Sequence, residues 1–116
     1  MGNPVVHWEV CGKDSKKLQG FYEKLFDWKI DADNPMGYGM VKTGTDAGIN
    51  GGIGPTEGGA PAYLTFYVQV EDLQAALDTA KKLGGQTLVP PTEIPNFVTF
   101  AMFADPEGNT VGLVKK

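Results

Sequence analysis

Residues 5–28 read VVHWEVCGKDSKKLQGFYEKLFDW, and this stretch decides the fold. Its first six residues alternate, so an extended strand would carry apolar side chains on one face and polar side chains on the other. The apolar face comprises Val6, Trp8 and Val10, and the opposite face comprises Val5, His7 and Glu9. Asp14 is the predicted N-cap of a helix, because a carboxylate there accepts hydrogen bonds from backbone N–H groups of the first turn. The helix is indicated by apolar residues at i, i+3, i+4 and i+7, namely Leu18, Phe21, Tyr22 and Leu25.

The same pattern recurs later in the chain. Residues 63–70 alternate as a strand does, and a helix is predicted from Asp72 to the Gly84-Gly85 pair, which ends it with a left-handed cap. A shift of 58 residues superposes the two segments without a gap, and it matches Val10 with Val68, Asp14 with Asp72, Lys24 with Lys82, Leu25 with Leu83, and His7 with Thr65. Further strands are predicted at 28–32, 38–43, 48–53, 86–89, 98–104 and 110–114, with Pro90-Pro91 among the breaks between them. The chain is therefore interpreted as two copies of a β-α-β-β-β unit of roughly 50 residues each.

The length of 116 residues is that of a single domain. Within this domain we expect a first module at about 5–54, a connector at 55–61 and a second module at about 62–116. The stretch 48–61 holds six glycines and two prolines, a composition typical of a connector. It is not interpreted as a phosphate-binding loop, because no lysine follows at the required offset and no helix is predicted to start there.

The charge balance argues against nucleic acid as a partner. The chain has 10 basic and 14 acidic residues, a net charge of -4, and every basic residue is a lysine. Nucleic-acid binding needs clustered positive charge, and bidentate recognition of phosphate needs arginine. No run approaches about 18 apolar residues and the first seven residues carry no basic leader, so we expect no membrane span and a cytoplasmic protein. The one cysteine, Cys11, agrees with a reducing compartment and is interpreted as a thiol at the edge of the core.

The polar strand faces supply the candidate site. If the apolar faces meet the two helices, the opposite faces line a concave surface, which is the usual form of a ligand site. His7 and Glu9 are the candidate catalytic residues, because an imidazole and a carboxylate at i and i+2 share one face of a strand. The expected ligand-binding residues are Trp28, Tyr38, Tyr63, Thr65, Tyr67, Gln69 and Phe97. The alternative is a solvated polar face, which antiparallel sheets often have.

Several segments, in this order and with this spacing, resemble the vicinal-oxygen-chelate superfamily, which includes glyoxalase I, bleomycin-resistance proteins and extradiol dioxygenases. They are HWEV at 7–10, Asp14, FYEKLFDW at 21–28, GGI at 51–53, VED at 70–72, LGG at 83–85 and FADPEGN at 103–109, and they span nearly the whole chain. The resemblance implies an α+β fold in which two tandem βαβββ modules form curved mixed sheets around a cleft, with the helices on the outer faces. It also implies a small-molecule ligand and a homodimer.

In the metal-dependent members of that superfamily, the first and last strands of each module supply four ligands, typically His, Glu or Gln. Carried over to this chain, the first-strand position is His7, and its counterpart in the second module is Thr65. The last-strand positions fall on Asn50 or Gly52 in the first module and on Gly112 in the second. A divalent cation needs several charged or imidazole ligands that converge, so no metal site is predicted. His7 and Glu9 would share an ion only with a third ligand, for example one from a dimer partner.

Two functions of different class fit these residues. The first is a small-molecule-binding protein of the bleomycin-resistance type, with an incomplete metal site and no cofactor. The alternative is a glyoxalase-like lyase or isomerase, with or without a divalent metal, in which His7 or Glu9 is the base. In that alternative the hydroxyl of Thr65 or Tyr67 would polarise a substrate carbonyl. A third class is a structural or regulatory dimer whose cleft is vestigial.

Overall fold

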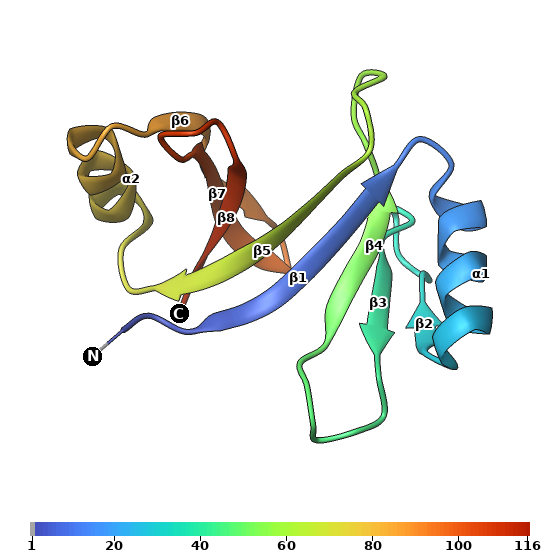
Figure 1. Cartoon of the computed structure of the whole chain (residues 1–116). Helices are drawn as coiled ribbons and strands as arrows, with labels where there is room; N and C mark the ends of the chain where they lie inside the picture. The colour runs from blue at the N-terminus through green and yellow to red at the C-terminus, as the bar shows by residue number, and fades with distance from the viewer. Residues whose placement is uncertain (1) are drawn as a thin grey trace. The chain divides into compact units, whose positions relative to one another are not determined.

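The computed structural model describes residues 2–116 and divides them into two compact units (Figure 1). The N-terminal unit is His7–Leu64. The C-terminal unit is Thr65–Lys116 together with the N-terminal segment that ends at Val6. Each unit combines a helix with a mixed sheet, so the predicted α+β class is confirmed.

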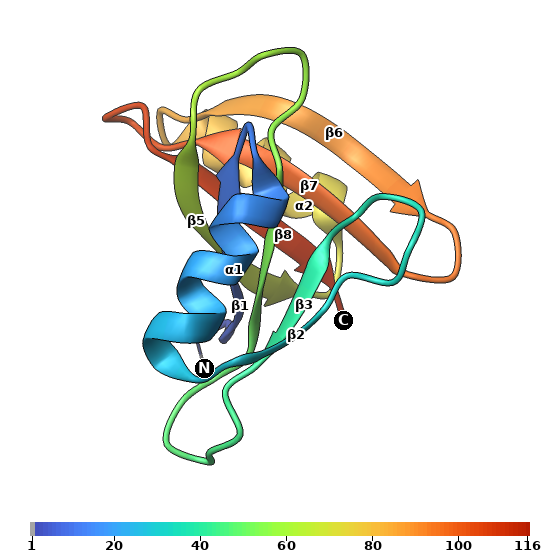
Figure 2. The same cartoon turned by 90° about the vertical axis from the view of Figure 1, so that its right-hand side faces the viewer.

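The N-terminal unit contains β1 (Val5–Gly12), α1 (Ser15–Phe26), β2 (Lys29–Asp31), β3 (Gly39–Lys42) and β4 (Gly51–Pro55), although Val5 and Val6 of β1 group with the other unit. Its strand order is β2-β3-β4-β1, with β1 parallel to β4 and the other neighbours antiparallel. In this register Glu9 lies opposite Gly52, and Cys11 lies opposite Gly54. Helix α1 packs against β4 and β2. Figure 2 views the molecule from the side on which α1 lies.

The C-terminal unit repeats this topology. It contains β5 (Tyr63–Val70), α2 (Leu73–Lys82), β6 (Gln86–Ile94), β7 (Val98–Ala104) and β8 (Thr110–Lys115), with Tyr63 and Leu64 of β5 grouped with the N-terminal unit. The strand order is β5-β8-β7-β6, and β5 is parallel to β8, with Tyr67 opposite Gly112. The predicted β-α-β-β-β order is therefore confirmed in both halves.

Both helices begin at the predicted caps. The carboxylate of Asp14 accepts a hydrogen bond from the backbone N–H of Lys17 at 3.1 Å, and that of Asp72 accepts one from Ala75 at 3.0 Å. Helix α2 also ends as predicted, because Gly84 has a φ of 103° and the next residue, Gly85, donates to the carbonyl of Ala80 at 2.8 Å.

Strand β6 is longer than predicted. The Pro90-Pro91 pair was expected to break it, yet the strand continues from Gln86 to Ile94. The pairing of β6 with β7 is irregular between Val89 and Thr92, so the two prolines lie in a segment where no regular ladder hydrogen bond is required.

The apolar stripe predicted for α1 is only partly buried. Leu18 and Tyr22 are half-buried, whereas Phe21 and Leu25 are 58% and 57% exposed. The buried position of the helix belongs to Gln19, whose Nε2 donates to the carbonyl oxygens of Ile53 at 2.8 Å and Gly37 at 3.1 Å. The amide thus satisfies two backbone acceptors of the unit. The side of the helix that carries Gln19 faces the interior, and part of the predicted apolar stripe does not.

The apolar face of β5 is also less covered than predicted. Leu64 and Phe66 are 72% and 43% exposed, although both were expected to meet a helix. Helix α2 packs against β6, β7 and β8 instead. The core beneath it is built from Val70, Leu73, Leu77, Ala101 and Leu113, with Val68 and Phe103 packed against it.

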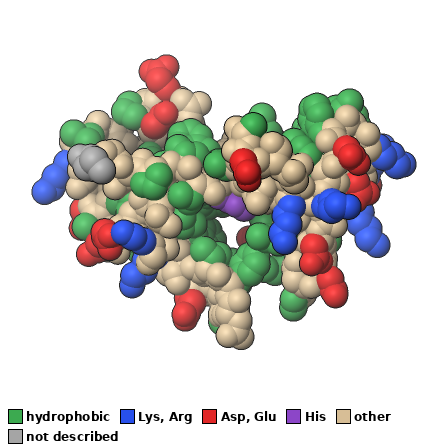
Figure 3. All heavy atoms as spheres, turned by 90° about the horizontal axis from the view of Figure 1, so that it is seen from below, with side chains coloured by type: hydrophobic (Ala, Val, Ile, Leu, Met, Phe, Trp, Pro, Cys, Tyr) green, Lys and Arg blue, Asp and Glu red, His purple; other side chains and the backbone are tan. Residues whose placement is uncertain are grey.

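Charged side chains of both signs are interspersed on the face drawn in Figure 3. Within residues 2–116, no helix is long and apolar enough to cross a membrane.

The buried Gln19 amide generates a stability prediction. Gln19→Ala leaves the buried carbonyl of Ile53 without the donor that Gln19 supplies, and it also removes the part-buried bond to Gly37, so we expect it to lower the free energy of unfolding by roughly 1–3 kcal/mol. The matched control is Gln74→Ala on α2, where the amide is exposed and donates to Asp78, and where we expect a change within about 0.5 kcal/mol. Urea unfolding of the three proteins measures both effects. Equal losses for the two variants would contradict this role of Gln19.

Candidate functional site

A hydrogen bond between His7 and Tyr38 is the centre of the candidate site. Alternation along β1 directs His7, Glu9 and Cys11 from one face of the strand. The Nε2 atom of His7 lies 2.7 Å from the hydroxyl of Tyr38, and the two rings are nearly parallel, with an interplanar angle of 24°. Tyr38 and His7 are 31 residues apart, so the fold of the unit brings them together.

A turn built on Asn34 positions Tyr38. The side-chain oxygen of Asn34 accepts hydrogen bonds from the backbone N–H groups of Met36 and Tyr38, and its amide nitrogen donates to the carbonyl of Tyr38 at 2.6 Å. Such local bonds are the usual role of Asn in turns. The sequence pattern did not predict that the Asn34 side chain orients a site residue.

The ring of Tyr38 lies on two glycines of β4. A Cβ atom built on Gly52 or Gly54 would overlap this ring, so each position needs glycine for close approach. Gly52 lies in the strand predicted at 48–53, and the observed strand β4 continues past that range to include Gly54.

Glu9, Tyr63 and Cys11 form a second polar cluster in the same unit. Glu9 is 8% exposed, and the hydroxyl of Tyr63 donates to its Oε2 at 3.3 Å. Burial raises the pKa of the Cys11 thiol to about 11, with the charge of Glu9 adding to the shift. Burial also raises the pKa of Tyr63, and the hydrogen bond with Cys11 and the charge of Glu9 raise it further. Cys11 and Tyr63 are therefore protonated at neutral pH, and Cys11 has the character of a core thiol, not of a nucleophile.

The imidazole of His7 is held in its neutral form. Burial lowers the pKa of His7, and the nearby charge of Glu9 opposes this shift without cancelling it. A neutral imidazole offers one acceptor and one donor nitrogen, so at pH 7 this face carries a group that can accept a proton.

In the C-terminal unit, three predicted residues lie on β5. Thr65 is buried, and its hydroxyl donates to the carbonyl of Thr110 at 2.8 Å. The ring of Tyr67 covers Gly112, where a Cβ atom would overlap it. Gln69 is half-buried, and its backbone N–H donates to Pro4.

Trp28 lies in an aromatic cluster with other partners. Its ring centroid lies 5.1 Å from the ring centroid of Trp8, 5.8 Å from that of Tyr22 and 4.9 Å from that of Phe26. Trp8 alternates with His7 along β1, so its side chain leaves the opposite face of the strand. The structure groups Trp28 with α1, and its role in ligand binding stays a prediction.

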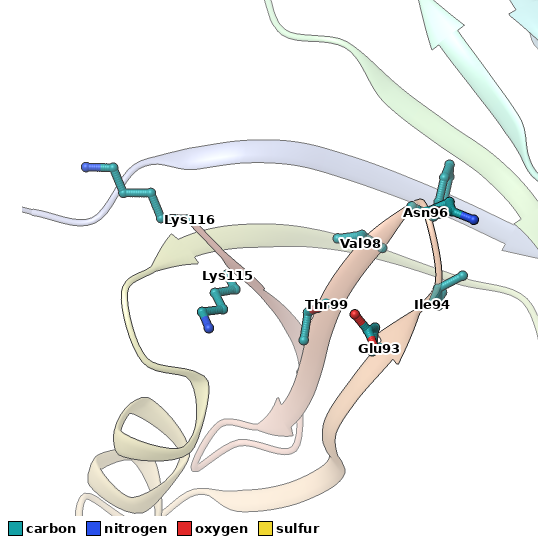
Figure 4. A pocket seen from close by; sticks show the side chains of 8 residues that line it. Glu93, Ile94, Asn96, Val98, Thr99, Lys115 and Lys116 are labelled. Atoms are coloured by element: carbon teal, nitrogen blue, oxygen red, sulfur yellow. The ribbon is translucent and has the colours of Figure 1, made fainter.

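Phe97 lines a cavity of about 360 Å³ in the C-terminal unit, together with Glu93, Ile94, Asn96, Val98, Thr99, Lys115 and Lys116 (Figure 4). Glu93 and Thr99 are paired across β6 and β7. A larger cavity, of about 680 Å³, lies between α2 and the sheet of the same unit. Neither cavity is lined by His7, Glu9 or Tyr38. Over the described residues, no three His, Cys, Asp or Glu side chains are grouped as metal ligands.

The sequence is similar to proteins of one known superfamily. The family profile described as "Glyoxalase/Bleomycin resistance protein/Dioxygenase superfamily" matches residues 5–113. A Mycobacterium bovis protein named "Putative glyoxylase CFP32" is 33% identical over 110 residues, which cover 86% of this chain and 41% of that protein. The chain thus spans less than half the length of this curated relative.

Solved structures share the fold at low sequence identity. Hypothetical protein BH1468 from Bacillus halodurans has a TM-score of 0.71 and 14% identity, covering 100% of this chain and 96% of the other. The Mn(II)-bound glyoxalase from Novosphingobium aromaticivorans has a TM-score of 0.67 and 12% identity, covering 97% of this chain and 38% of the other.

The lowered pKa of His7 can be measured directly, because the chain has one histidine. We expect its imidazole signals, followed by NMR in tag-free protein, to titrate below the ordinary value of about 6.5. Glu9→Gln removes the charge that opposes the shift and should lower the pKa further. Because the folded pKa is depressed, the stability contributed by neutral His7 is present above about pH 6.5 and is lost as the pH falls through the folded pKa. A pKa at or above 6.5 would contradict this account of the site.

Proposed function

Because the chain belongs to the glyoxalase/bleomycin resistance protein/dioxygenase superfamily, we propose that it binds a small molecule at the face of β1 that carries His7 and Glu9. The observation that supports this most directly is the 2.7 Å hydrogen bond between His7 and Tyr38. It places an imidazole, a phenol hydroxyl and an aromatic face together in one unit. Such a combination binds ligands by hydrogen bonds and stacking.

The buried carboxylate of Glu9 strengthens this proposal. A carboxylate that is 8% exposed is costly unless it is hydrogen-bonded, and Tyr63 supplies one such bond. A polar cluster retained in a largely buried position favours recognition of polar groups on a ligand. Ligand contact by the other predicted residues, Thr65, Tyr67, Gln69, Trp28 and Phe97, stays a separate prediction, because Trp28 packs with α1 and Phe97 lines the cavity of Figure 4.

A second candidate function is proton transfer beside a substrate carbonyl, as in a glyoxalase-like lyase or isomerase. The neutral state of His7 favours it, since an uncharged imidazole can accept a proton at pH 7. In this reaction His7 takes the proton from a hydroxyl-bearing carbon next to the carbonyl and returns it to the former carbonyl carbon. The proton of that hydroxyl moves to the former carbonyl oxygen, so the carbonyl changes place and the enzyme is unchanged. The Tyr38 hydroxyl, as the hydrogen-bond partner of His7, orients the imidazole.

We propose a second copy of the chain as protein partner. Phe21, Leu25 and Phe26 of α1 are each more than half exposed, and contiguous apolar surface of this kind usually marks an interface. The larger cavity of the C-terminal unit offers an apolar surface in Val68, Phe103 and Leu113. The net charges are complementary. Helix α1 carries three lysines and one acid, Glu23, whereas the acidic residues that flank the cavity are Glu71, Asp72 and Asp105. We propose that α1 of one copy docks on this surface of another.

We also propose that the protein works in the cytoplasm. Cys11 is a free, buried thiol, and one unpaired cysteine agrees with a reducing compartment. Fractionation of cells that produce the protein would test the compartment.

The binding proposal is tested by a thermal-shift screen of small molecules, followed by calorimetry of the hits. His7→Ala should weaken binding about tenfold, because it removes a hydrogen-bonding group worth about 1.4 kcal/mol. The matched control, Lys115→Ala at the cavity of Figure 4, should leave the affinity unchanged. Reversed effects of the two variants would assign the ligand to that cavity and refute the proposal. Exchange of solvent deuterium into a carbonyl hit, abolished in His7→Ala, would instead establish the second function.

The proposed interface is tested by light scattering at several protein concentrations. The wild-type chain should be dimeric, and Leu25→Glu should dissociate it more than Leu25→Lys, because the new carboxylate would face acidic groups. Leu88→Glu on β6, an exposed apolar position outside the proposed surface, is the control and should stay dimeric. A monomeric wild type at tens of micromolar would rule out the interface, as would equal effects of Leu25→Glu and Leu88→Glu.

A further inference from the structure

One tyrosine ring covers one glycine at the same sheet position in each unit. Gly52 of β4 lies opposite Glu9 of the parallel strand β1, and Gly112 of β8 lies opposite Tyr67 of the parallel strand β5. The two glycines therefore occupy equivalent positions in the two repeats. A Cβ atom on Gly52 would overlap the ring and hydroxyl of Tyr38, and one on Gly112 would overlap the ring of Tyr67.

This packing decides whether the four-ligand metal site of the metal-dependent relatives could form in this chain. Their last strands supply ligand side chains, but here the space for such a side chain is filled by a phenol ring in both units. The second first-strand position, Thr65, directs its hydroxyl hydrogen to the carbonyl of Thr110. The residues present therefore do not fit the four-ligand site.

The first-strand histidine is also engaged with a tyrosine. The Nε2 atom of His7 lies 2.7 Å from the hydroxyl of Tyr38, the same residue whose ring covers Gly52. A single tyrosine thus occupies the ligand space of β4 and hydrogen-bonds the imidazole of β1. For a cation to be held by His7 and a side chain at position 52, Tyr38 would have to leave both positions.

We infer that tyrosine–glycine pairs, Tyr38 with Gly52 and Tyr67 with Gly112, have replaced the last-strand metal ligands of both repeats. The chain accordingly binds its ligand without a cation, through hydrogen bonds and ring contacts. The ligand class is an organic molecule with hydrogen-bonding groups and an apolar or aromatic part, and a pair of chelating oxygens gives it no advantage. This inference rests on the proposed function, which it deepens.

The first test is metal content and metal response of the wild-type chain. Protein purified without chelators should contain no stoichiometric ion by elemental analysis. Zn²⁺, Ni²⁺, Mn²⁺ and Mg²⁺, each added alone, should leave its Tm unchanged, because binding to the native state would raise it. A tightly held ion at one per chain, or a saturable rise in Tm with any of the four, would overturn the inference.

The second test measures the coupling between Tyr38 and Gly52. Gly52→Ala should lower Tm by about 5 °C or more, because the new methyl group overlaps the ring. In the Tyr38→Ala background the same change should be neutral or stabilising, since alanine is otherwise preferred to glycine within a strand. Tyr38→Phe removes the hydroxyl but keeps the ring atoms that also overlap the new methyl group, so it should retain most of the penalty of Gly52→Ala. The control Gly20→Ala in α1, where a Cβ atom meets nothing within 4 Å, should not lower Tm.

The outcomes separate this inference from the proposed function. Equal penalties for Gly52→Ala with and without the Tyr38 ring would refute the tyrosine–glycine pairing, even if a ligand binds at His7. If Tyr38→Ala does not fold, the comparison of Gly52→Ala with Gly20→Ala and the wild-type metal analysis still decide. Conversely, a screen without ligands, combined with the expected metal and coupling results, would refute the proposed binding and leave the pairing standing.

Discussion

The parallel pairing of β1 with β4 is the constraint on which the candidate site depends. It sets Glu9 opposite Gly52 and Cys11 opposite Gly54. The side chains of His7, Glu9 and Cys11 therefore lie on the face of β1 that is next to the glycines of β4. Only a surface without side chains lets the ring of Tyr38 lie flat enough on β4 for its hydroxyl to reach His7. A shift of one residue would turn His7 and Glu9 to the opposite face, toward the side of Trp8. The position of the site residues in this unit therefore depends on both the strand register and the glycines of β4.

The two repeats keep one backbone plan and diverge in chemistry. Where the N-terminal unit has His7 and Glu9, the C-terminal unit has Thr65 and Tyr67 at the positions matched by a shift of 58 residues. The space above the last-strand glycine is filled from the loop before β3 in one unit, by Tyr38, and from the first strand β5 in the other, by Tyr67. Ionisable groups have thus been kept in one repeat, and neutral hydroxyl groups stand at the matching places in the other.

Local patterns explain what could be predicted from sequence. The caps at Asp14 and Asp72 and the stop at Gly84 depend on neighbours within a few residues, and all three were confirmed. What was missed depends on distant partners. The rotation of α1 is set by acceptors of Gln19 in β4 and in the loop before β3, and the orientation of Tyr38 needs a histidine 31 residues away. Apolar periodicity also does not predict whether a residue such as Phe21 is buried within the same chain or stays exposed.

The second unit is discontinuous in sequence. Its first segment ends at Val6, and the carbonyl of Pro4 accepts a hydrogen bond from Gln69 at 2.9 Å, so β5 relies on residues synthesised more than sixty positions earlier. The boundaries between the two units therefore fall inside β1 and inside β5, and not in the glycine-rich stretch. A gene cut at that stretch would yield a C-terminal fragment that lacks part of its own structure. The duplicated sequence therefore cannot be divided into its two structural units by one cut of the chain.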